Sequence, residues 1–333
     1  MVMAWKRLGT VSIKNQSGFP QPTAGKVREL KRSEYFVVKG YSITGEAPKE
    51  FVRVFIPKKS WKTKPRHWPL FIAKTGQKWY PCESIIEHLN TRIGQALGLD
   101  MAETHLVLAK GQLRILSRYF LGQEEELIHG ANIYMGYLSD EQFVNEVERQ
   151  KQEVHFFTIS STREALKVVF PLHHEKLFHQ FLRMLLLDAF IGCNDRHMYN
   201  WGIKRSLFGS EPKFAPIYDT ARSLFWNESE FKLERIAKDE KTYKEFLERY
   251  CIKSKAKIGI ENHGQVNHVA LVKCLKEKDL ISVEELKQFF SESNFNKVKD
   301  VIVKEFSPLL SELRIKYICD YLDVRMKSIH AVL

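Results

Sequence analysis

Short apolar runs of strand type fill the first third of the chain, and longer runs of helical type fill most of the rest. The strand-type runs are rich in aromatic and β-branched residues. One of them, residues 113–120, alternates in the manner of a half-buried strand. Residues 84–99 have amphipathic spacing, which predicts a helix with Ser84 as its N-cap and Gly98 as its stop. The other predicted strands cover residues 35–38, 51–56 and 69–74.

The second part of the chain centres on one long apolar run. Residues 178–191 are good helix formers, which predicts a buried helix that ends at Gly192. Asp188 lies inside this run, so we expect it to be a hydrogen-bonded carboxylate of the core. Two short strands are predicted next, at residues 199–204 and 213–218. Further helices are predicted at residues 140–148, 161–170, 243–250, 266–276, 283–290, 296–306 and 309–326.

These patterns predict an α+β fold of two lobes, a small β-rich lobe over residues 1–120 and a large, mostly helical lobe over residues 121–333. A hydrophobic content of 44% supports a proper core. No apolar run reaches the ~18 residues of a membrane span, and residues 1–7 are not followed by the apolar stretch of a secretory signal. The five cysteines are dispersed, as reduced thiols are. We therefore expect a cytoplasmic protein that has no membrane partner, and secretion by a route that needs no such signal stays open.

The loop after the buried helix carries the most informative side chains. Asp195 and Asn200 lie five residues apart, and Asp219 follows Asp195 by 24 residues. Phosphoryl transfer uses such a set, because one carboxylate deprotonates the attacking hydroxyl while an amide oxygen and a second carboxylate hold Mg²⁺ on the nucleotide phosphates. A hairpin of the two predicted strands would bring Asn200 and Asp219 to one metal. Each residue alone could equally cap a helix or make a turn, so their combination carries the prediction.

Two residues of the N-terminal half fit the same chemistry. A kinase holds the nucleotide phosphates with a lysine on a strand, and an acidic residue on a helix positions that lysine. Lys74 ends a predicted strand, and Glu87 lies in the first turn of the predicted helix. Singly, Lys74 is also typical of a solvated strand end and Glu87 of a helix-dipole partner; together they favour a kinase pair. Gly45 and Lys49 lie in a loop whose backbone N–H groups could cradle phosphate oxygens.

The segment around Asp195 resembles the HipA-like kinases, a family of bacterial Ser/Thr kinases. Residues 192–201 read Gly-Cys-Asn-Asp-Arg-His-Met-Tyr-Asn-Trp and are similar to the catalytic loop of the family, as the Tyr-Asp of residues 218–219 is to its metal-binding segment. The resemblance implies a protein-kinase-like fold with ATP and Mg²⁺ as cofactors. It also implies that Asp195 is the catalytic base and that Asn200 and Asp219 bind the metal.

The resemblance covers roughly residues 40–225 and implies further roles. Ser42 is the site at which the resemblance implies an inactivating autophosphorylation, with Thr44 as a second candidate. Phosphorylation there would inactivate the enzyme because two added negative charges would repel the nucleotide. His197, a second catalytic candidate, would either contact phosphate or lock the loop by hydrogen bonds, and both readings stay open. Residues 117–119 would lie beside adenine as the hinge. The implied nucleotide-binding residues are Ser42, Thr44, Gly45, Lys49, Lys74, Glu87, Ser117, Arg118, Tyr119 and Tyr218.

The charge balance leaves room for other functions. The formal net charge is +12, and the densest basic run, residues 58–68, also carries two Trp. That mixture suits nucleic acid through phosphate contacts and stacking, although we favour a solvated loop between two strands. The alternatives to a Ser/Thr protein kinase are a kinase-fold enzyme acting on a small molecule or lipid, and a basic nucleic-acid-binding regulator. The resemblance implies a protein substrate with Ser or Thr and, as in toxin–antitoxin systems, a DNA-binding antitoxin as partner.

Overall fold

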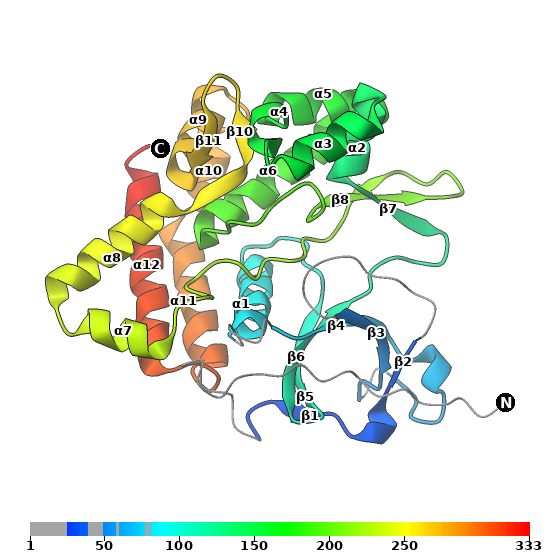
Figure 1. The fold of residues 1–333 in the computed structure, drawn as a ribbon, viewed down its shortest axis with the longest axis vertical. Helices are drawn as coiled ribbons and strands as arrows, with labels where there is room; N and C mark the ends of the chain where they lie inside the picture. The colour runs from blue at the N-terminus through cyan, green and yellow to red at the C-terminus, as the bar shows by residue number, and fades with distance from the viewer. Residues whose placement is uncertain (1–24, 39–48, 58–59, 77–79, 81) are drawn as a thin grey trace.

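The computed structural model describes residues 25–38, 49–57, 60–76, 80 and 82–333. Figure 1 shows a β-rich part followed by a mostly helical part, which confirms the predicted α+β, two-lobed fold class. Ser42, Thr44 and Gly45 lie outside the described residues. In the described part of the chain, no helix is long and apolar enough to span a membrane.

The N-terminal part is built on one six-stranded sheet. Its strand order is β1-β5-β6-β4-β3-β2, with β1 parallel to β5 and the other neighbours antiparallel. Alternate side chains of β4 face one apolar core, because successive side chains of a strand point to opposite faces: Phe71 and Ala73 are buried there with Val52 and Leu116. The strands are β1 (Arg28–Glu29), β2 (Tyr35–Val37), β3 (Lys49–Val54), β4 (Leu70–Lys74), β5 (Thr104–Ala109) and β6 (Gln112–Arg118), with 3-10 turns at Arg32–Glu34 and Pro65–His67.

Helix α1 (Glu83–Ala96) lies between the sheet and the helical part. Its residues Ile86, Leu89 and Ile93 are fully buried at helical spacing, as predicted. The predicted N-cap is wrong: the helix begins one residue before Ser84, and the Ser84 hydroxyl instead accepts a hydrogen bond from Gly76 N at 3.0 Å. The helix ends as predicted at Gly98, whose φ of +73° is readily adopted by glycine.

The far side of α1 packs against helix α11 (Glu292–Phe306). Arg92 of α1 makes a two-pronged ion pair with Glu305, at 2.8 and 2.9 Å. One turn earlier, the ring of His88 packs on Phe306 with the ring centres 5.6 Å apart. The C-terminal helices thereby contact the helix that carries Glu87.

The helical part surrounds helix α6 (His174–Ile191), the predicted buried helix. Twelve of its 18 residues are buried, so it contacts neighbours on most sides, which explains its nearly uninterrupted apolar sequence. The remaining helices are α2 (Gly130–Leu138), α3 (Glu141–Arg149), α4 (Glu153–Phe156), α5 (Ile159–Val169), α7 (Glu230–Ala237), α8 (Glu240–Lys253), α9 (His268–Glu277), α10 (Val283–Phe289) and α12 (Glu312–His330).

Two small sheets complete the helical part. Strand β8 (Gly202–Ser206) pairs with β7 (Glu125–His129) and β9 (Lys213–Phe214), so the predicted hairpin forms with shorter strands than expected. The hairpin of β10 (Lys255–Ile260) and β11 (Gly264–Asn267) was not predicted, and its last two residues replace the start of the helix predicted at residues 266–276. The chain leaves the first sheet after Arg118 and joins the second at β7. The division at residue 121 into domains stays a prediction.

Buried polar contacts hold the C-terminal end of α6. Gly192 ends the helix with a φ of +72°, and a Cβ there would lie 2.1 Å from the Tyr321 hydroxyl. Arg325 of α12 donates to Ala189 O at 3.0 Å, and His268 of α9 donates from Nε2 to Cys193 O at 2.8 Å. Burial and, to a smaller extent, the charge of Arg325 together lower the pKa of His268 to about 3. The loop after α6 therefore starts from a fixed point.

His268 predicts a loss of stability in acid. Because its pKa of about 3 in the folded chain lies below the ordinary value of 6.5, only the unfolded chain takes up this proton as the pH falls from 6.5 toward 3. The contribution is fully present above pH 6.5 and is lost at up to about 1.4 kcal/mol per pH unit within that window. Urea unfolding at pH 7 and pH 5 should show a smaller loss in His268→Gln, which keeps a donor for Cys193 O. The exposed His263→Gln is the control. Equal losses in both variants would contradict the assignment.

Candidate active site

The loop between α6 and β8 carries Asp195, His197 and Asn200. It begins where Gly192 N and Cys193 N both donate to Asp188 O, at 2.8 and 3.0 Å. Within the loop, Asn200 Nδ2 donates to Asp195 O at 2.7 Å. The side chain of one predicted functional residue thus binds the backbone of the other. The amide oxygen of Asn200 is the end of the side chain that is left to bind a cation.

Asp195 faces a cation in the described structure. Its Oδ2 lies 3.3 Å from Nε of Arg222, a residue that follows Asp219 closely in the chain. Burial raises the pKa of Asp195 above its ordinary range, and the charge of Arg222 opposes that shift. A carboxyl with a raised pKa accepts a proton more readily, which suits a general base.

His197 makes a local hydrogen bond within the loop. Tyr199 N donates to its Nδ1 at 3.3 Å, so this contact fits the loop-locking role that the sequence left open. Burial lowers the pKa of His197, so the ring is neutral near pH 7. The neutral ring can then present Nε2 as a hydrogen-bond donor.

The predicted kinase pair is present and includes a third residue. Lys74 Nζ donates to Glu87 Oε1 at 2.8 Å and to Asp219 Oδ1 at 3.0 Å. Lys49 Nζ lies 3.7 Å from Oδ2 of the same Asp219. Residues predicted from four separate segments, residues 49, 74, 87 and 219, thus meet at one point.

The charges of this cluster support one another. Burial alone would lower the pKa of Lys74, but Asp219 and Glu87 raise it above its ordinary value, so the ammonium stays charged. Burial alone would raise the pKa of Asp219, but Lys74 and Lys49 hold it well below its usual range. Burial raises the pKa of Glu87, and Lys74 opposes the shift. Asp219 is therefore an ionised carboxylate, and its side chain is more exposed than those of Lys74 and Glu87.

Further residues, which the sequence prediction did not assign to the site, hold the segment around Asp219. Asn90 of α1 donates from Nδ2 to Thr220 O at 2.5 Å and to the Ser223 hydroxyl at 2.8 Å. Asp219 itself has a φ of +55°, a left-handed conformation that Asp adopts more readily than most residues. Asn90 lies one turn from Glu87, so this helical spacing is the signal that could have identified it.

Arg196 is the second such residue. It is buried and pairs with Asp188 through Nε–Oδ2 at 2.9 Å and Nη2–Oδ1 at 3.0 Å. Its Nη1 donates to Asn200 O and to Tyr218 O, both at 2.7 Å. The expectation that Asp188 is a hydrogen-bonded core carboxylate is thereby met, and Arg196 is its partner.

The oxygen groups of Asn200 and Asp219 are of the kind that Mg²⁺ prefers. No cluster of three or more His, Cys, Asp and Glu side chains among the described residues could hold a metal ion by itself. A Mg²⁺ bound here would take its remaining ligands from phosphates and water, as Mg²⁺ commonly does in nucleotide sites. The residues present therefore fit Mg²⁺ delivered together with a nucleotide.

Backbone groups of the predicted hinge, residues 117–119, already make hydrogen bonds within and beside the sheet. Ser117 pairs with Ile72 on one side and Thr104 on the other. The N–H groups of Arg118 and Tyr119 donate to Glu103 O and Leu70 O, at 2.7 and 2.9 Å. Backbone donors for adenine would accordingly come from the residues just after this segment. Tyr218 lies nearby, with its ring centre 5.8 Å from that of Phe120.

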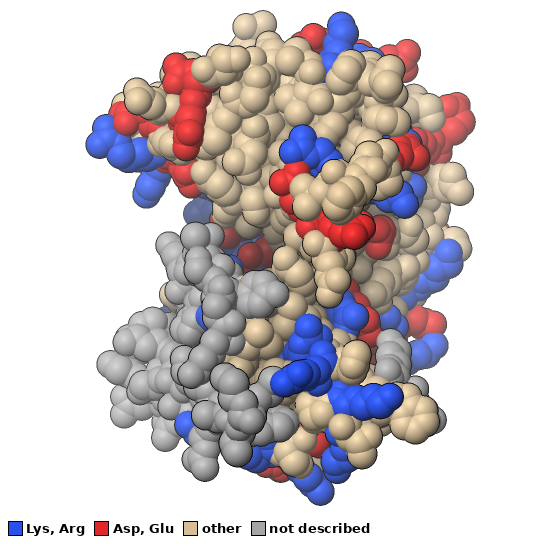
Figure 2. Space-filling model, turned by 90° about the vertical axis from the view of Figure 1, so that its right-hand side faces the viewer, with Lys and Arg blue, Asp and Glu red and all other residues tan. Residues whose placement is uncertain are grey.

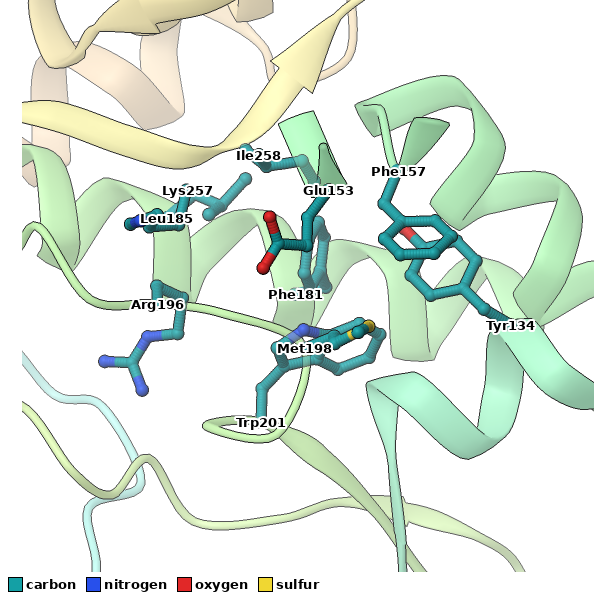
Figure 3. A pocket seen from close by; sticks show the side chains of 10 residues that line it. All are labelled: Tyr134, Glu153, Phe157, Phe181, Leu185, Arg196, Met198, Trp201, Lys257 and Ile258. Atoms are coloured by element: carbon teal, nitrogen blue, oxygen red, sulfur yellow. The ribbon is translucent and has the colours of Figure 1, made fainter. Parts of the chain in front are cut away.

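A small cavity lies behind the loop, on the side of α4 and β10 (Figure 3). Met198, Trp201 and Arg196 line it from the loop, and the Glu153 carboxylate points into it. Its volume of about 20 Å³ is room for roughly one water molecule. Nucleotide cannot enter a space of this size.

Comparisons with known proteins identify the family of this chain. The model of the HipA-like C-terminal domain matches residues 41–274. The fold is similar to that of the proinflammatory kinase CtkA of Helicobacter pylori, with a TM-score of 0.71 and 18% identity over 89% of this chain and 93% of that chain. Comparison with HipA of Shewanella oneidensis MR-1, solved with HipB and operator DNA, gives a TM-score of 0.45 and 11% identity. It covers 87% of this chain and 65% of HipA. No curated protein matches the chain. Since the family model covers more than half of its length, the chain belongs to the HipA-like family.

Proposed function

We propose that this protein is an ATP-dependent Ser/Thr protein kinase of the HipA-like type. Family membership supports a kinase, and the fold is that of a known kinase. The observation that carries the proposal is the position of Lys74 Nζ between Glu87 and Asp219, at 2.8 and 3.0 Å. Protein kinases hold the nucleotide phosphates with a lysine that a helix carboxylate positions, and they hold Mg²⁺ with a second carboxylate. The same three residue types meet here.

The proposed reaction assigns a role to each charged residue. Asp195 accepts the proton of the substrate hydroxyl, whose oxygen bonds to the γ-phosphorus as the bond from that phosphorus to the leaving oxygen of ADP breaks. Lys74 binds the α- and β-phosphates. Asn200 and Asp219 hold Mg²⁺, which supplies positive charge to the phosphates when bound. Most of the catalysis is then positioning and electrostatic stabilisation.

The resting contacts fit this proposal. Asp219 is paired with the ammonium groups of Lys74 and Lys49 in the described structure. On nucleotide binding, the phosphates would become the partners of these lysines, and the carboxylate of Asp219 would bind the metal ion instead. Each charge keeps an opposite partner in both states, which avoids an unpaired buried charge.

We place the nucleotide in the recess between the β-rich part and the mostly helical part of the described chain. Figure 2 shows a hollow between the upper and lower parts in which basic and acidic side chains are both visible. Lys and Arg side chains also gather on the lower part of this face. A positive field of this kind favours the approach of ATP. A DNA-binding antitoxin as partner stays an expectation from the family resemblance.

Autophosphorylation in the phosphate loop is part of the proposal. Lys49 begins β3 and lies next to Asp219, so the described chain enters the site region at this residue. Ser42 lies seven residues before Lys49, and an extended chain of seven residues spans at most ~25 Å. A chain of this length permits the phosphate transfer that we propose to Ser42, with Thr44 as the second candidate.

Loss of the proposed base should abolish phosphate transfer without abolishing ATP binding. Asp195→Asn keeps the shape of the side chain but removes its proton-accepting charge, so we expect a fall of about 10²- to 10⁴-fold in the initial rate of phosphate incorporation from labelled ATP with Mg²⁺. The matched control is Asp279→Asn, an exposed position whose φ of +55° also suits Asn.

The location of the label decides between the candidate functions. Label at Ser42 or Thr44 that disappears in Asp195→Asn supports a self-modifying protein kinase. Label only on a small molecule or lipid would replace the protein substrate by that class. Absence of ATP binding in the wild type would contradict the kinase proposal and favour the nucleic-acid-binding regulator.

The ion pair of Asp195 predicts a pH effect. The base must be ionised to act, so activity falls as the pH drops through its pKa, which burial raises and Arg222 opposes. Arg222→Met removes the opposing charge, and the acidic limb of the rate profile should then move to higher pH. Arg205→Met, which removes an exposed pairing with Glu126, should leave the limb in place. An unmoved limb in Arg222→Met would show that Asp195 does not set it.

A further inference from the structure

We propose that Arg196, held by Asp188, is a positioning residue that sets the separation of the two metal-binding side chains. The inference rests on the proposed function, because it takes Asn200 and Asp219 as the Mg²⁺ ligands. It adds that their spacing is determined by one guanidinium group and is not left to the loop that connects them.

The contacts of Arg196 reach both ligand segments at once. Nη1 donates to the carbonyl of Asn200 itself and to the carbonyl of Tyr218, the residue immediately before Asp219, at 2.7 Å each. The two carbonyls belong to residues 18 positions apart in the chain. One nitrogen atom therefore joins the backbone of the first ligand to the backbone that leads into the second.

The guanidinium is fixed from its other side. Nε and Nη2 donate to the two oxygens of Asp188, at 2.9 and 3.0 Å. A planar guanidinium has five N–H donors in a rigid fork, and four are engaged if each contact uses one hydrogen. Lysine cannot reproduce this pattern, since its single nitrogen cannot bind a carboxylate in two-pronged fashion and also span two carbonyls.

Burial makes the position of this group well determined. Arg196 is 3% exposed and Asp188 is 1% exposed, so water does not compete for the contacts. Asp188 lies on α6, the central helix of the helical part, and its own carbonyl accepts the N–H groups of Gly192 and Cys193. The carboxylate therefore transmits the position of α6 to the metal-binding segments through Arg196.

Residues that hold metal ligands in place commonly change metal affinity by about 10- to 100-fold when they are replaced. We expect the same range here for the contribution of Mg²⁺ to nucleotide affinity. Nucleotide affinity without Mg²⁺ should stay unchanged, because Lys74 and Lys49 would bind the phosphates. The hydrogen bonds described for Arg196 go to other residues.

The test compares Arg196→Lys with a matched control, Arg314→Lys. Arg314 is also a buried arginine that pairs with a carboxylate, Glu230 at 2.6 Å, and donates to backbone carbonyls, including Phe225 O at 2.9 Å. Binding of a non-hydrolysable ATP analogue is measured by calorimetry with and without Mg²⁺, and thermal unfolding is recorded for each variant. This readout needs no protein substrate.

The inference is supported if Arg196→Lys loses about 10- to 100-fold of the Mg²⁺-dependent gain in affinity while Arg314→Lys keeps the wild-type gain. It is overturned if Arg196→Lys is folded and keeps the gain, or if both variants lose it equally. A wild-type protein that binds the analogue without any Mg²⁺-dependent gain overturns the proposed metal ligands as well, which separates the two failures.

A second variant covers the case in which Arg196→Lys does not fold. Asp188→Asn keeps the size of the side chain and the guanidinium but removes the charge that orients it. The expected change has the same direction and a smaller size. A folded Asp188→Asn with the full wild-type gain counts against the inference.

Discussion

The site depends on one buried ammonium group that two carboxylates share. Lys74 belongs to β4, Glu87 to α1 and Asp219 to the segment after β9, so the charge balance connects the sheet, the helix beside it and the helical part. A buried lysine without these partners would be strongly disfavoured, and so would either carboxylate without the lysine. The three elements are therefore held in one relative arrangement by electrostatics as much as by packing.

The segment from Tyr218 to Ser223 has no regular secondary structure, and side chains take the place of a hydrogen-bonded ladder. Asn90 binds it from α1, Arg196 from the loop after α6, and Asn194 N donates to Arg222 O at 3.1 Å. Buried backbone groups need partners, and here two polar side chains and one backbone N–H supply them. Such contacts allow the left-handed conformation of Asp219 to persist at the proposed metal-binding position.

The sequence predicts the features that depend on local spacing. The run at residues 178–191 becomes α6, and the positions of Lys74 and Glu87 predict a pair that the structure brings to 2.8 Å. It does not predict that Arg196 is the partner of Asp188, because that contact depends on how the loop folds back beneath the helix. The β10–β11 hairpin is likewise absent from the prediction: its strand at Lys255–Ile260 is short and mixes lysine with small residues, and contacts with α4 and α9 stabilise it.

The ion pair between Arg92 and Glu305 links α1 to a helix that lies beyond residue 274, where the match to the family model ends. The family-defining region of the chain thus contains the whole of the charged cluster but not all of the protein that keeps α1 in place. Substitutions in the C-terminal helices can leave every motif of the family unchanged and still alter how firmly α1 holds Glu87 beside Lys74. Relatives with the same motifs and different C-terminal helices would then share a chemistry while differing in how often the site is assembled.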